Sequence, residues 1–174
     1  MGGSLGAKLI NKTVPKVFSK ISEDFPDFKF ILSHQCGRGN LEETKSYYDS
    51  CKTSFDLKLF EFVENMENFY SNADLVISRA GALSVSEICE TQNIAIFIPL
   101  KNSIDNHQYE NAKFLAEKNS AFICEEDFME ENLKKILFEI IKNPEILENM
   151  KKNIAKVSLT DKKNIILKNI LSNE

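Results

Sequence analysis

Short apolar runs rich in Phe, Ile and Val alternate with longer segments of helical periodicity over the first two thirds of the chain. Runs of this length and composition predict buried strands, and the longer segments predict helices. We expect strands at residues 29–33, 57–62, 75–78, 95–99 and 121–124, and helices at about residues 8–22, 41–50, 66–71, 84–92 and 106–119. Strands that alternate with helices are typical of a parallel sheet with crossover connections. The pattern therefore predicts an α/β fold, built as a Rossmann-like, doubly wound parallel sheet.

The last third of the chain carries only helical patterns, with apolar residues at helical spacing and Lys and Glu on the other face. Asn143, Pro144 and Glu145 supply an N-cap, a proline suited to the first helical position and an acid in the first turn. A further helix should begin there, and we expect a last helix at about residues 161–171. Since no repeat or linker interrupts the chain, we expect one domain over residues 1–174 with a helical C-terminal tail.

The charge balance excludes one large class of partners. The 26 acidic and 22 basic residues leave a net charge of −4, so no positive field would attract a phosphate backbone, and we expect no nucleic-acid partner. The 4 cysteines and 2 histidines do not fall at metal-ligand spacing, and we expect reduced thiols, no metal and no cofactor. The sequence has no run of about 18 apolar residues and no signal-peptide pattern, so we expect a cytoplasmic protein.

Residues 2–7 form a glycine-rich stretch that opens the first predicted helix. Glycines let the backbone approach a ligand closely, and the free amides of a helix N-terminus attract anions such as a diphosphate. The hydroxyl of Ser4 is placed to donate to the same phosphate. The alternative is a helix N-cap serine after a glycine turn, and the stretch alone favours neither hypothesis.

A second glycine turn, residues 79–87, follows the predicted strand that ends at Ser78 and opens another helix. Open α/β sheets bind ligands at the carboxyl ends of their strands, where this turn lies. In the alternative, Ser84 and Glu87 form a capping box in which the glutamate reaches back to an N-cap amide, and for this turn alone that is the better hypothesis. Two such turns in one chain, however, suit a nucleotide diphosphate sugar, with Glu87 placed to accept hydrogen bonds from ribose hydroxyls. Neither turn is a complete dinucleotide-binding fingerprint.

A polar loop, residues 99–112, follows a predicted buried strand and runs into a helix. Loops at this edge of an α/β sheet carry specificity, and His107, Gln108 and Asn111 are donors and acceptors suited to sugar hydroxyls. In the alternative, Asp105 and Gln108 are the N-cap and N3 residues of the helix. His107 as a general base is the weaker hypothesis, because a single histidine without a visible partner is more often a surface residue.

Together the stretches at residues 2–7, 73–87 and 105–112 resemble one family and occur in its order. It is the MurG family, UDP-N-acetylglucosamine–N-acetylmuramyl-(pentapeptide) pyrophosphoryl-undecaprenol N-acetylglucosamine transferase, and the similarity extends over the helical tail. The resemblance implies the C-terminal, donor-binding half of a two-domain GT-B glycosyltransferase. The family's N-terminal acceptor domain would then be absent. The strand before Gly2 would also be missing, although the first strand of a doubly wound sheet is normally central.

The resemblance further implies where the phosphates and the ribose bind. Ser4 and the turn at Leu83 and Ser84 would hold the diphosphate, and Glu87 would take the ribose hydroxyls. Ala82 would contribute backbone contacts to the sugar. Helix N-termini and a serine hydroxyl would stabilise the negative charge that develops on the leaving diphosphate.

The resemblance also implies a base pocket and a sugar pocket. The backbone of Val63 would read the edge of the uracil, while Phe62 and Met66 pack around the nucleotide; without the family, these three are expected core residues. His107 and Gln108 would lie beside the N-acetylglucosamine hydroxyls. The implied substrate-binding residues are Ser4, Phe62, Val63, Met66, Ala82, Leu83, Ser84, Val85, Ser86, Glu87, His107 and Gln108.

The activity implied by the resemblance is that of an inverting hexosyltransferase dependent on UDP-N-acetylglucosamine. With an N-terminal acceptor domain, the chain would transfer N-acetylglucosamine to lipid I and give lipid II in peptidoglycan synthesis, and so serve cell wall biogenesis, cell shape and cell division. The chain alone is expected to be inactive, since the catalytic base is expected in the missing domain. The full enzyme would work at the inner face of the cell membrane, with the membrane contact outside this domain. The alternatives are the donor-binding subunit of a two-chain lipid-linked N-acetylglucosaminyltransferase and a non-catalytic UDP-sugar-binding fragment.

Overall fold

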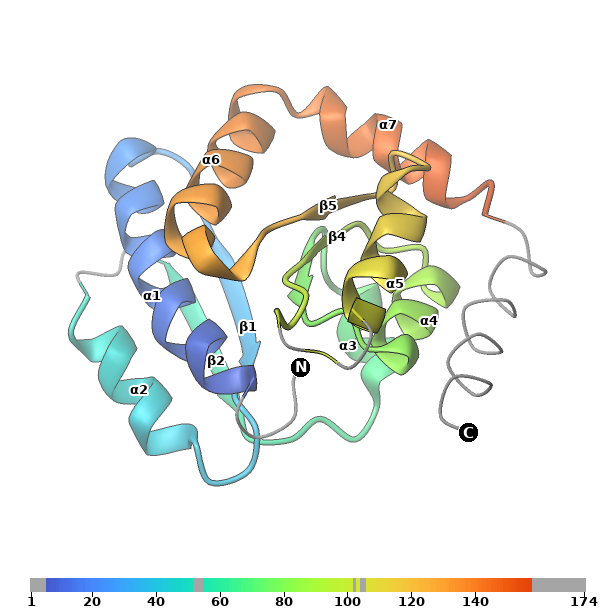
Figure 1. Ribbon diagram of the computed structural model, residues 1–174. Coiled ribbons are helices and arrows are strands. Elements are labelled where there is room, and N and C mark those ends of the chain that lie inside the picture. Colours follow the sequence, from blue (N-terminus) through green and yellow to red (C-terminus); the bar gives the residue numbers. More distant parts are fainter. Residues whose placement is uncertain (1–5, 52–54, 102, 104–105, 158–174) are drawn as a thin grey trace. The chain divides into compact units, whose positions relative to one another are not determined.

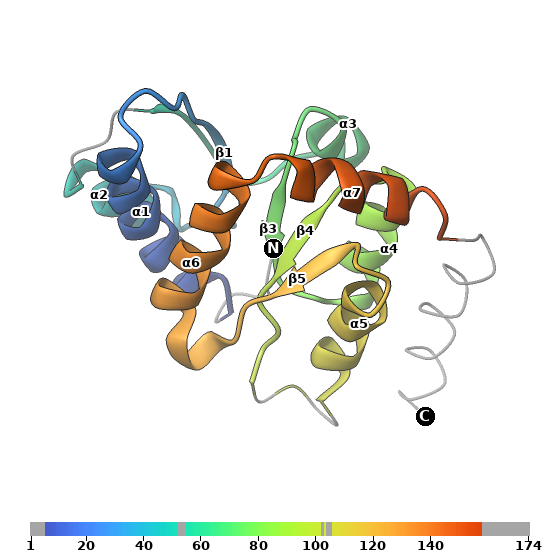
Figure 2. The same cartoon turned by 90° about the horizontal axis from the view of Figure 1, so that it is seen from above.

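The computed structural model describes residues 6–51, 55–101, 103 and 106–157, with the backbone alone for residues 6 and 7. These residues form two compact units. The first comprises the described residues up to Glu64 together with Phe128–Glu139. The second comprises the described residues of Asn65–Asp127 and those from Ile140 onward. Each unit combines helices with a parallel sheet, as Figure 1 and Figure 2 show.

The first unit is built on a two-stranded parallel sheet. Its elements are α1 (Gly6–Asp24), β1 (Ile31–Gln35), α2 (Leu41–Asp49), β2 (Asp56–Phe60) and most of α6 (Met129–Lys142). The register places Ile31 beside Asp56 and Gln35 beside Phe60. Among the described residues, β1 pairs with β2 alone.

Helix α1 supplies much of the apolar core of the first unit. Its buried residues recur every three or four positions, as expected for an amphipathic helix. They are Ile10, Val14, Val17, Phe18 and Ile21, none more than 8% exposed. Two surface ion pairs join α1 to α6, Lys20 with Glu130 at 2.6 Å and Lys134 with Asp24 at 2.8 Å. Exposed pairs of this kind contribute about 0–1 kcal/mol each, so the buried apolar face of α1 contributes more to the stability of the first unit.

The second unit is built on a three-stranded parallel sheet in the order β3–β4–β5. Its elements are α3 (Met66–Ser71), β3 (Val76–Ser78), α4 (Ala82–Glu90), β4 (Ala95–Phe97), α5 (His107–Ala116), β5 (Ala121–Ile123), most of the short 3-10 helix η2 (Glu126–Phe128) and α7 (Glu145–Ile154). All three residues of the central strand β4 are 0% exposed, which is typical of a parallel strand covered on both faces. Helices α4 and α5 lie side by side in both views (Figure 1, Figure 2).

The α/β class and the parallel arrangement predicted from the sequence are confirmed. Each of the predicted strands is present, with ends that differ from the prediction by at most two residues; β1, for example, begins at Ile31 rather than at residue 29. Apolar runs define where a strand lies, whereas its ends depend on which backbone groups find a partner in the neighbouring strand. The single domain over residues 1–174 and the missing first strand stay predictions.

The predicted N-cap of α7 is wrong by one residue. The helix begins at Glu145, and Pro144 rather than Asn143 occupies the N-cap position. The Asn143 carbonyl accepts from the amide of Ile146 at 3.0 Å, so the chain makes a tight turn before the helix proper. The last predicted helix, at residues 161–171, lies outside the described residues.

Candidate functional site

The turn after β3 presents an open helix N-terminus. Gly81 is the N-cap of α4 in an extended conformation, with φ −63° and ψ 149°, and no side chain caps this end among the described residues. The first intrahelical bond runs from the Val85 amide to the Gly81 carbonyl at 2.9 Å. The amides of Ala82, Leu83 and Ser84 therefore precede the helical ladder and are available to an anion. A Cβ atom added at position 81 would meet no atom within 4 Å, so the space beside this turn is open.

The capping-box hypothesis for this turn is wrong. Ser84 lies within the first turn of α4 rather than before it, because the helix begins at Ala82. Glu87 is therefore in the middle of the helix and has no N-cap serine to pair with. One of its carboxylate oxygens, Oε2, is buried and makes no hydrogen bond within the described part of the chain. A capping role for Glu87 is therefore no longer an alternative to ligand binding.

Glu87 shares its buried surroundings with Tyr70 of α3. Burial raises the pKa of Glu87, and the nearby Tyr70 hydroxyl partly offsets this rise. Burial also raises the pKa of Tyr70, which is 3% exposed, and the charge of Glu87 adds to that effect. Neither Glu87 Oε2 nor the Tyr70 hydroxyl has a hydrogen bond of ordinary geometry to another described residue. The carboxylate of Glu87 and the hydroxyl of Tyr70 therefore interact chiefly with each other, beside the middle of α4. Buried polar groups with raised pKa values are frequent at functional sites.

The third stretch folds back onto the second. Asn106, in a left-handed conformation with φ 59°, is the N-cap of α5 rather than Asp105, which lies outside the described residues. Gln108 does not act as an N3 cap, because its Oε1 accepts from the amide of Leu100 at 3.1 Å. Asn111 Nδ2 donates to the carbonyl of Ala80 at 3.1 Å. These two bonds fasten the start of α5 to the end of β4 and to the glycine turn after β3.

A buried guanidinium joins the carboxyl ends of the three strands. Arg79 follows β3 directly and is 2% exposed. Its Nη1 donates to the carbonyl of Ile98 at 3.1 Å, and its Nη2 pairs with Glu126 Oε1 at 2.5 Å. The other oxygen of Glu126 accepts from the amide of Lys101 at 3.2 Å. Arg79 is the first residue of the glycine turn at residues 79–87, and nothing local in the sequence connects it to a glutamate 47 positions later.

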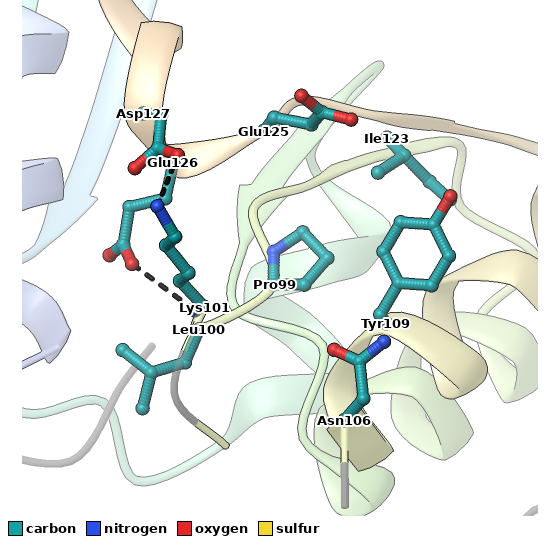
Figure 3. A pocket seen from close by; sticks show the side chains of 9 residues that line it. All are labelled: Pro99, Leu100, Lys101, Asn106, Tyr109, Ile123, Glu125, Glu126 and Asp127. Atoms are coloured by element: carbon teal, nitrogen blue, oxygen red, sulfur yellow. Dashed lines mark hydrogen bonds and ion pairs between the residues drawn. The ribbon is translucent and has the colours of Figure 1, made fainter.

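A pocket of about 210 Å³ opens at this edge of the sheet, beyond the ends of β4 and β5 (Figure 3). Figure 3 shows the Lys101 side chain paired with Asp127, while the Lys101 amide is held by Glu126. The lining residues are Pro99, Leu100, Lys101, Asn106, Tyr109, Ile123, Glu125, Glu126 and Asp127. The start of α5 forms one wall, so the pocket adjoins the segment that carries His107 and Gln108. The sequence did not predict the acidic side of the pocket, because Glu125, Glu126 and Asp127 form no recognisable motif.

The predicted site residues divide between the two units. Those on α4 and at the start of α5 lie in the second unit, at the carboxyl edge of its sheet: Ala82, Leu83, Ser84, Val85, Ser86, Glu87, His107 and Gln108. Within that set, Val85 and Ser86 are 0% and 4% exposed, so their side chains belong to the core.

The residues predicted to hold the uracil do not all lie in one unit. Phe62 and Val63 belong to the first unit and Met66 to the second. Phe62 is 55% exposed rather than a core residue, and Arg38 lies over its ring at 5.0 Å. Ser4 lies outside the described residues. The assignment of these four residues to a nucleotide stays a prediction.

Two general features bear on the class of site. Within the described ranges, no three His, Cys, Asp or Glu side chains gather as a metal site would require. Over the same ranges, no helix combines the length and apolar character of a membrane span. A parallel sheet with an open helix N-terminus and polar loops at the carboxyl ends of its strands is the class of α/β protein that binds nucleotides and related anions.

The family follows from comparison with known proteins. Residues 1–166 match the model of the glycosyltransferase family 28 C-terminal domain, and the chain belongs to this family. Two similar proteins are both named UDP-N-acetylglucosamine–N-acetylmuramyl-(pentapeptide) pyrophosphoryl-undecaprenol N-acetylglucosamine transferase. The one from Rickettsia bellii strain RML369-C is 39% identical over 156 residues, and these cover 89% of this chain and 43% of the relative. The one from Acinetobacter baumannii strain ATCC 17978 is 37% identical over 150 residues, covering 86% and 40%.

Solved structures agree with this family. The crystal structure of Acinetobacter baumannii MurG matches with a TM-score of 0.80 and 32% identity, over 95% of this chain and 47% of that one. The glycotransferase of kitacinnamycin matches with a TM-score of 0.58 at 17% identity, which shows a shared fold alone. The chain thus spans less than half the length of the relatives it matches, and the GT-B resemblance holds for their C-terminal part.

Proposed function

We propose that the chain binds UDP-N-acetylglucosamine as the donor domain of a hexosyltransferase. The observation that carries the proposal is the buried carboxylate oxygen of Glu87, which has no capping role and lies about one and a half turns from the open N-terminus of α4. One nucleotide could satisfy both parts of the helix: its diphosphate would accept from the first amides of α4, and its two ribose hydroxyls would donate to the Glu87 carboxylate. The names of the relatives specify this sugar nucleotide as their donor.

The proposed site assigns one part of the donor to each element. The amides of Leu83 and Ser84 hold the diphosphate, and Glu87 accepts from the ribose. The roles of Ser4 at the diphosphate and of Phe62, Val63 and Met66 at the uracil are those that the family resemblance implies. Ala82 contacts the sugar through its backbone. The start of α5 supplies His107 and Gln108, which bind the sugar hydroxyls and the acetamido group.

The proposed reaction is an inverting displacement on the anomeric carbon of N-acetylglucosamine. The muramoyl hydroxyl of lipid I attacks this carbon, the bond to the diphosphate breaks, UDP departs, and a base on another part of the enzyme takes the hydroxyl proton. The chain's own contribution is electrostatic, because the fixed dipoles at the start of α4 stabilise the negative charge that grows on the leaving diphosphate. The product would be lipid II.

The acceptor side of this reaction would come from elsewhere. Since the chain spans 43% of one relative and 40% of another, we place the lipid I site and the base on an N-terminal domain or on a partner chain. The complete enzyme would then act on the cytoplasmic face of the membrane that holds lipid I. A chain that binds the donor without ever meeting such a partner would instead be a non-catalytic UDP-sugar-binding module.

Calorimetric titration of the folded chain with UDP-N-acetylglucosamine tests the donor site. We expect binding that exceeds that of UDP-glucose, since the acetamido group adds polar contacts. The Glu87→Ala variant should lose most of the affinity, whereas Glu90→Ala, an exposed carboxylate of the same helix, should keep it. A folded chain that binds neither sugar nucleotide overturns the proposal.

A further inference from the structure

One polar network of the second unit is centred on Arg79, a side chain too deeply buried to reach a ligand. Arg79 is 2% exposed, and its donors are directed to the carbonyls of Ile98 and Pro99 and to Glu126 Oε1, at 3.1, 3.5 and 2.5 Å. A guanidinium is planar and carries its donors in a fixed fork, so it can serve a strand end and a carboxylate together. Arg79 thereby joins the residues that follow β3, β4 and β5.

Glu126, held by Arg79, in turn fixes the backbone of the segment after β4. While its Oε1 pairs with Arg79, its Oε2 accepts from the Lys101 amide at 3.2 Å. The preceding amide, that of Leu100, donates to Gln108 Oε1 at 3.1 Å. Two consecutive amides are therefore held from two sides, one by Glu126 and the next by Gln108. Any shift of Leu100 and Lys101 must displace the Gln108 side chain.

We propose that Arg79 and Glu126 are positioning residues for sugar recognition: through the backbone of Leu100 and Lys101, their buried ion pair fixes the direction of the Gln108 amide. Because Oε1 of Gln108 is engaged by Leu100, its Nε2 is the group directed to a ligand, and the network makes Gln108 a donor to the sugar. Neither Arg79 nor Glu126 touches the donor. This inference rests on the proposed function and deepens it, since it assigns the preference for the sugar to a network separate from the nucleotide contacts.

The test separates sugar recognition from nucleotide binding. Calorimetry gives the affinities for UDP and for UDP-N-acetylglucosamine of the unaltered chain and of Glu126→Ala. We expect UDP affinity to change by less than about twofold, while the preference for UDP-N-acetylglucosamine over UDP falls about tenfold, as for the loss of one well-placed hydrogen bond. Glu126→Gln, which retains an acceptor of the same size, should recover part of this preference. Glu117→Ala, which removes an exposed carboxylate at the far end of α5, should leave it unchanged.

A second substitution keeps the test decisive if Glu126→Ala does not fold. Arg79→Lys preserves the charge but cannot form the same fork, so it should also lower the sugar preference while UDP binding persists. Equal weakening of both ligands, or an unchanged preference in both variants, overturns the positioning role. An unaltered chain that binds no UDP overturns the proposed function itself, and the positioning role with it.

Discussion

Glu87 is the residue at which, on the proposed function, stability and binding oppose each other. Its carboxylate is half-buried and leaves one oxygen without a hydrogen bond to any described residue, which is unfavourable for the free protein. Functional sites often keep such groups because the ligand satisfies them. Its sequence spacing from Ser84 pointed to a structural cap instead, and only the position of the helix start distinguished the two roles.

Replacing Glu87 with glutamine should separate the two effects. Because the folded pKa of Glu87 is raised above its ordinary value, ionisation of Glu87 lowers the free energy of unfolding as pH rises through that pKa. Glutamine carries no charge to desolvate, so at pH 7.5 the melting temperature should rise, by about 2–4 °C for each kcal/mol relieved. Affinity for UDP should fall about tenfold, since hydrogen bonds to a charged group are among the strong ones.

Thermal melts and calorimetry on Glu87→Gln and on the exposed control Glu90→Gln check this prediction. A Glu87→Gln protein that melts lower and binds UDP normally would show that the carboxylate supports the fold rather than the ligand.

Gln108 offers a second test at the scale of a single amide. Its Oε1 accepts from the Leu100 amide, so in the proposed site its amide nitrogen is the group that donates to the sugar. In Gln108→Glu the carboxylate still accepts from Leu100 but has nothing to donate. We expect affinity for UDP-N-acetylglucosamine to fall about tenfold while UDP binding is unchanged, measured by calorimetry. Unchanged sugar affinity would mean that Gln108 faces the sugar with an acceptor or not at all.

At the scale of elements, His34 joins α1, β1 and α2. Asn11 Nδ2 donates to the Cys36 carbonyl at 2.9 Å, so Asn11 Oδ1 is free to accept from His34 Nε2 at 2.9 Å. His34 Nδ1 must then accept from the Tyr48 hydroxyl at 2.9 Å. Both ring nitrogens of a neutral imidazole are thus used. Burial lowers the pKa of His34 to about 4, well below its ordinary 6.5.

This network predicts a loss of stability in weak acid. Between pH 6.5 and about pH 4 the unfolded chain binds a proton that the folded His34 does not, so the free energy of unfolding falls as pH drops through this range. The slope from His34 should approach about 1.4 kcal/mol per pH unit. In His34→Gln this part of the slope should be absent. Denaturant unfolding at pH 7, 6 and 5 measures it, and identical slopes in the two proteins would contradict the network.

The starts of the helices were the hardest part of the elements to predict. Side-chain rules pointed to Ser84, Asp105 and Asn143 as caps, yet the N-cap positions are taken by Gly81, Asn106 and Pro144, and none of these makes a side-chain capping bond. A cap contributes about 1 kcal/mol, which the packing of a helix between strands readily outweighs. At α4 the absence of a side-chain cap also leaves the first amides open to an anion. Local rules tend to fail where a site is built.

At the scale of the whole molecule, the sequence predicts the class of sheet but not its pairing. Runs of Phe, Ile and Val mark each strand, and the helices between them imply parallel order. Contacts such as that of Arg79 with Glu126, across 47 positions, leave no trace in any local pattern. Glycine turns and polar loops were sufficient to place the candidate site at the carboxyl edge, because the topology of α/β sheets brings those ends together. The residues that fix its geometry needed the structure.

The proposed division of labour predicts that turnover requires a second domain. Alone, the chain should bind the donor and transfer nothing to lipid I. Joined to the N-terminal half of the Acinetobacter baumannii relative, it should form lipid II and release UDP, and Glu87→Gln should raise the KM for the donor about tenfold in that fusion. Product formation is measured by chromatography of the lipid fraction. A folded fusion that binds the donor without transfer would favour the non-catalytic alternative.

Gly81 allows the conformational and the steric reasons for a glycine in this turn to be separated. Its φ of −63° suits any residue, and an added Cβ would meet no atom within 4 Å. Alanine would restrict the unfolded chain but is a poorer N-cap than glycine, so stability should change by less than about 1 kcal/mol in Gly81→Ala. A methyl group there would extend into the open space beside the amides of α4, and calorimetry should show weaker UDP binding in a protein that melts normally. The fold does not require this glycine, and on the proposed function the open space beside it is the space that the diphosphate occupies.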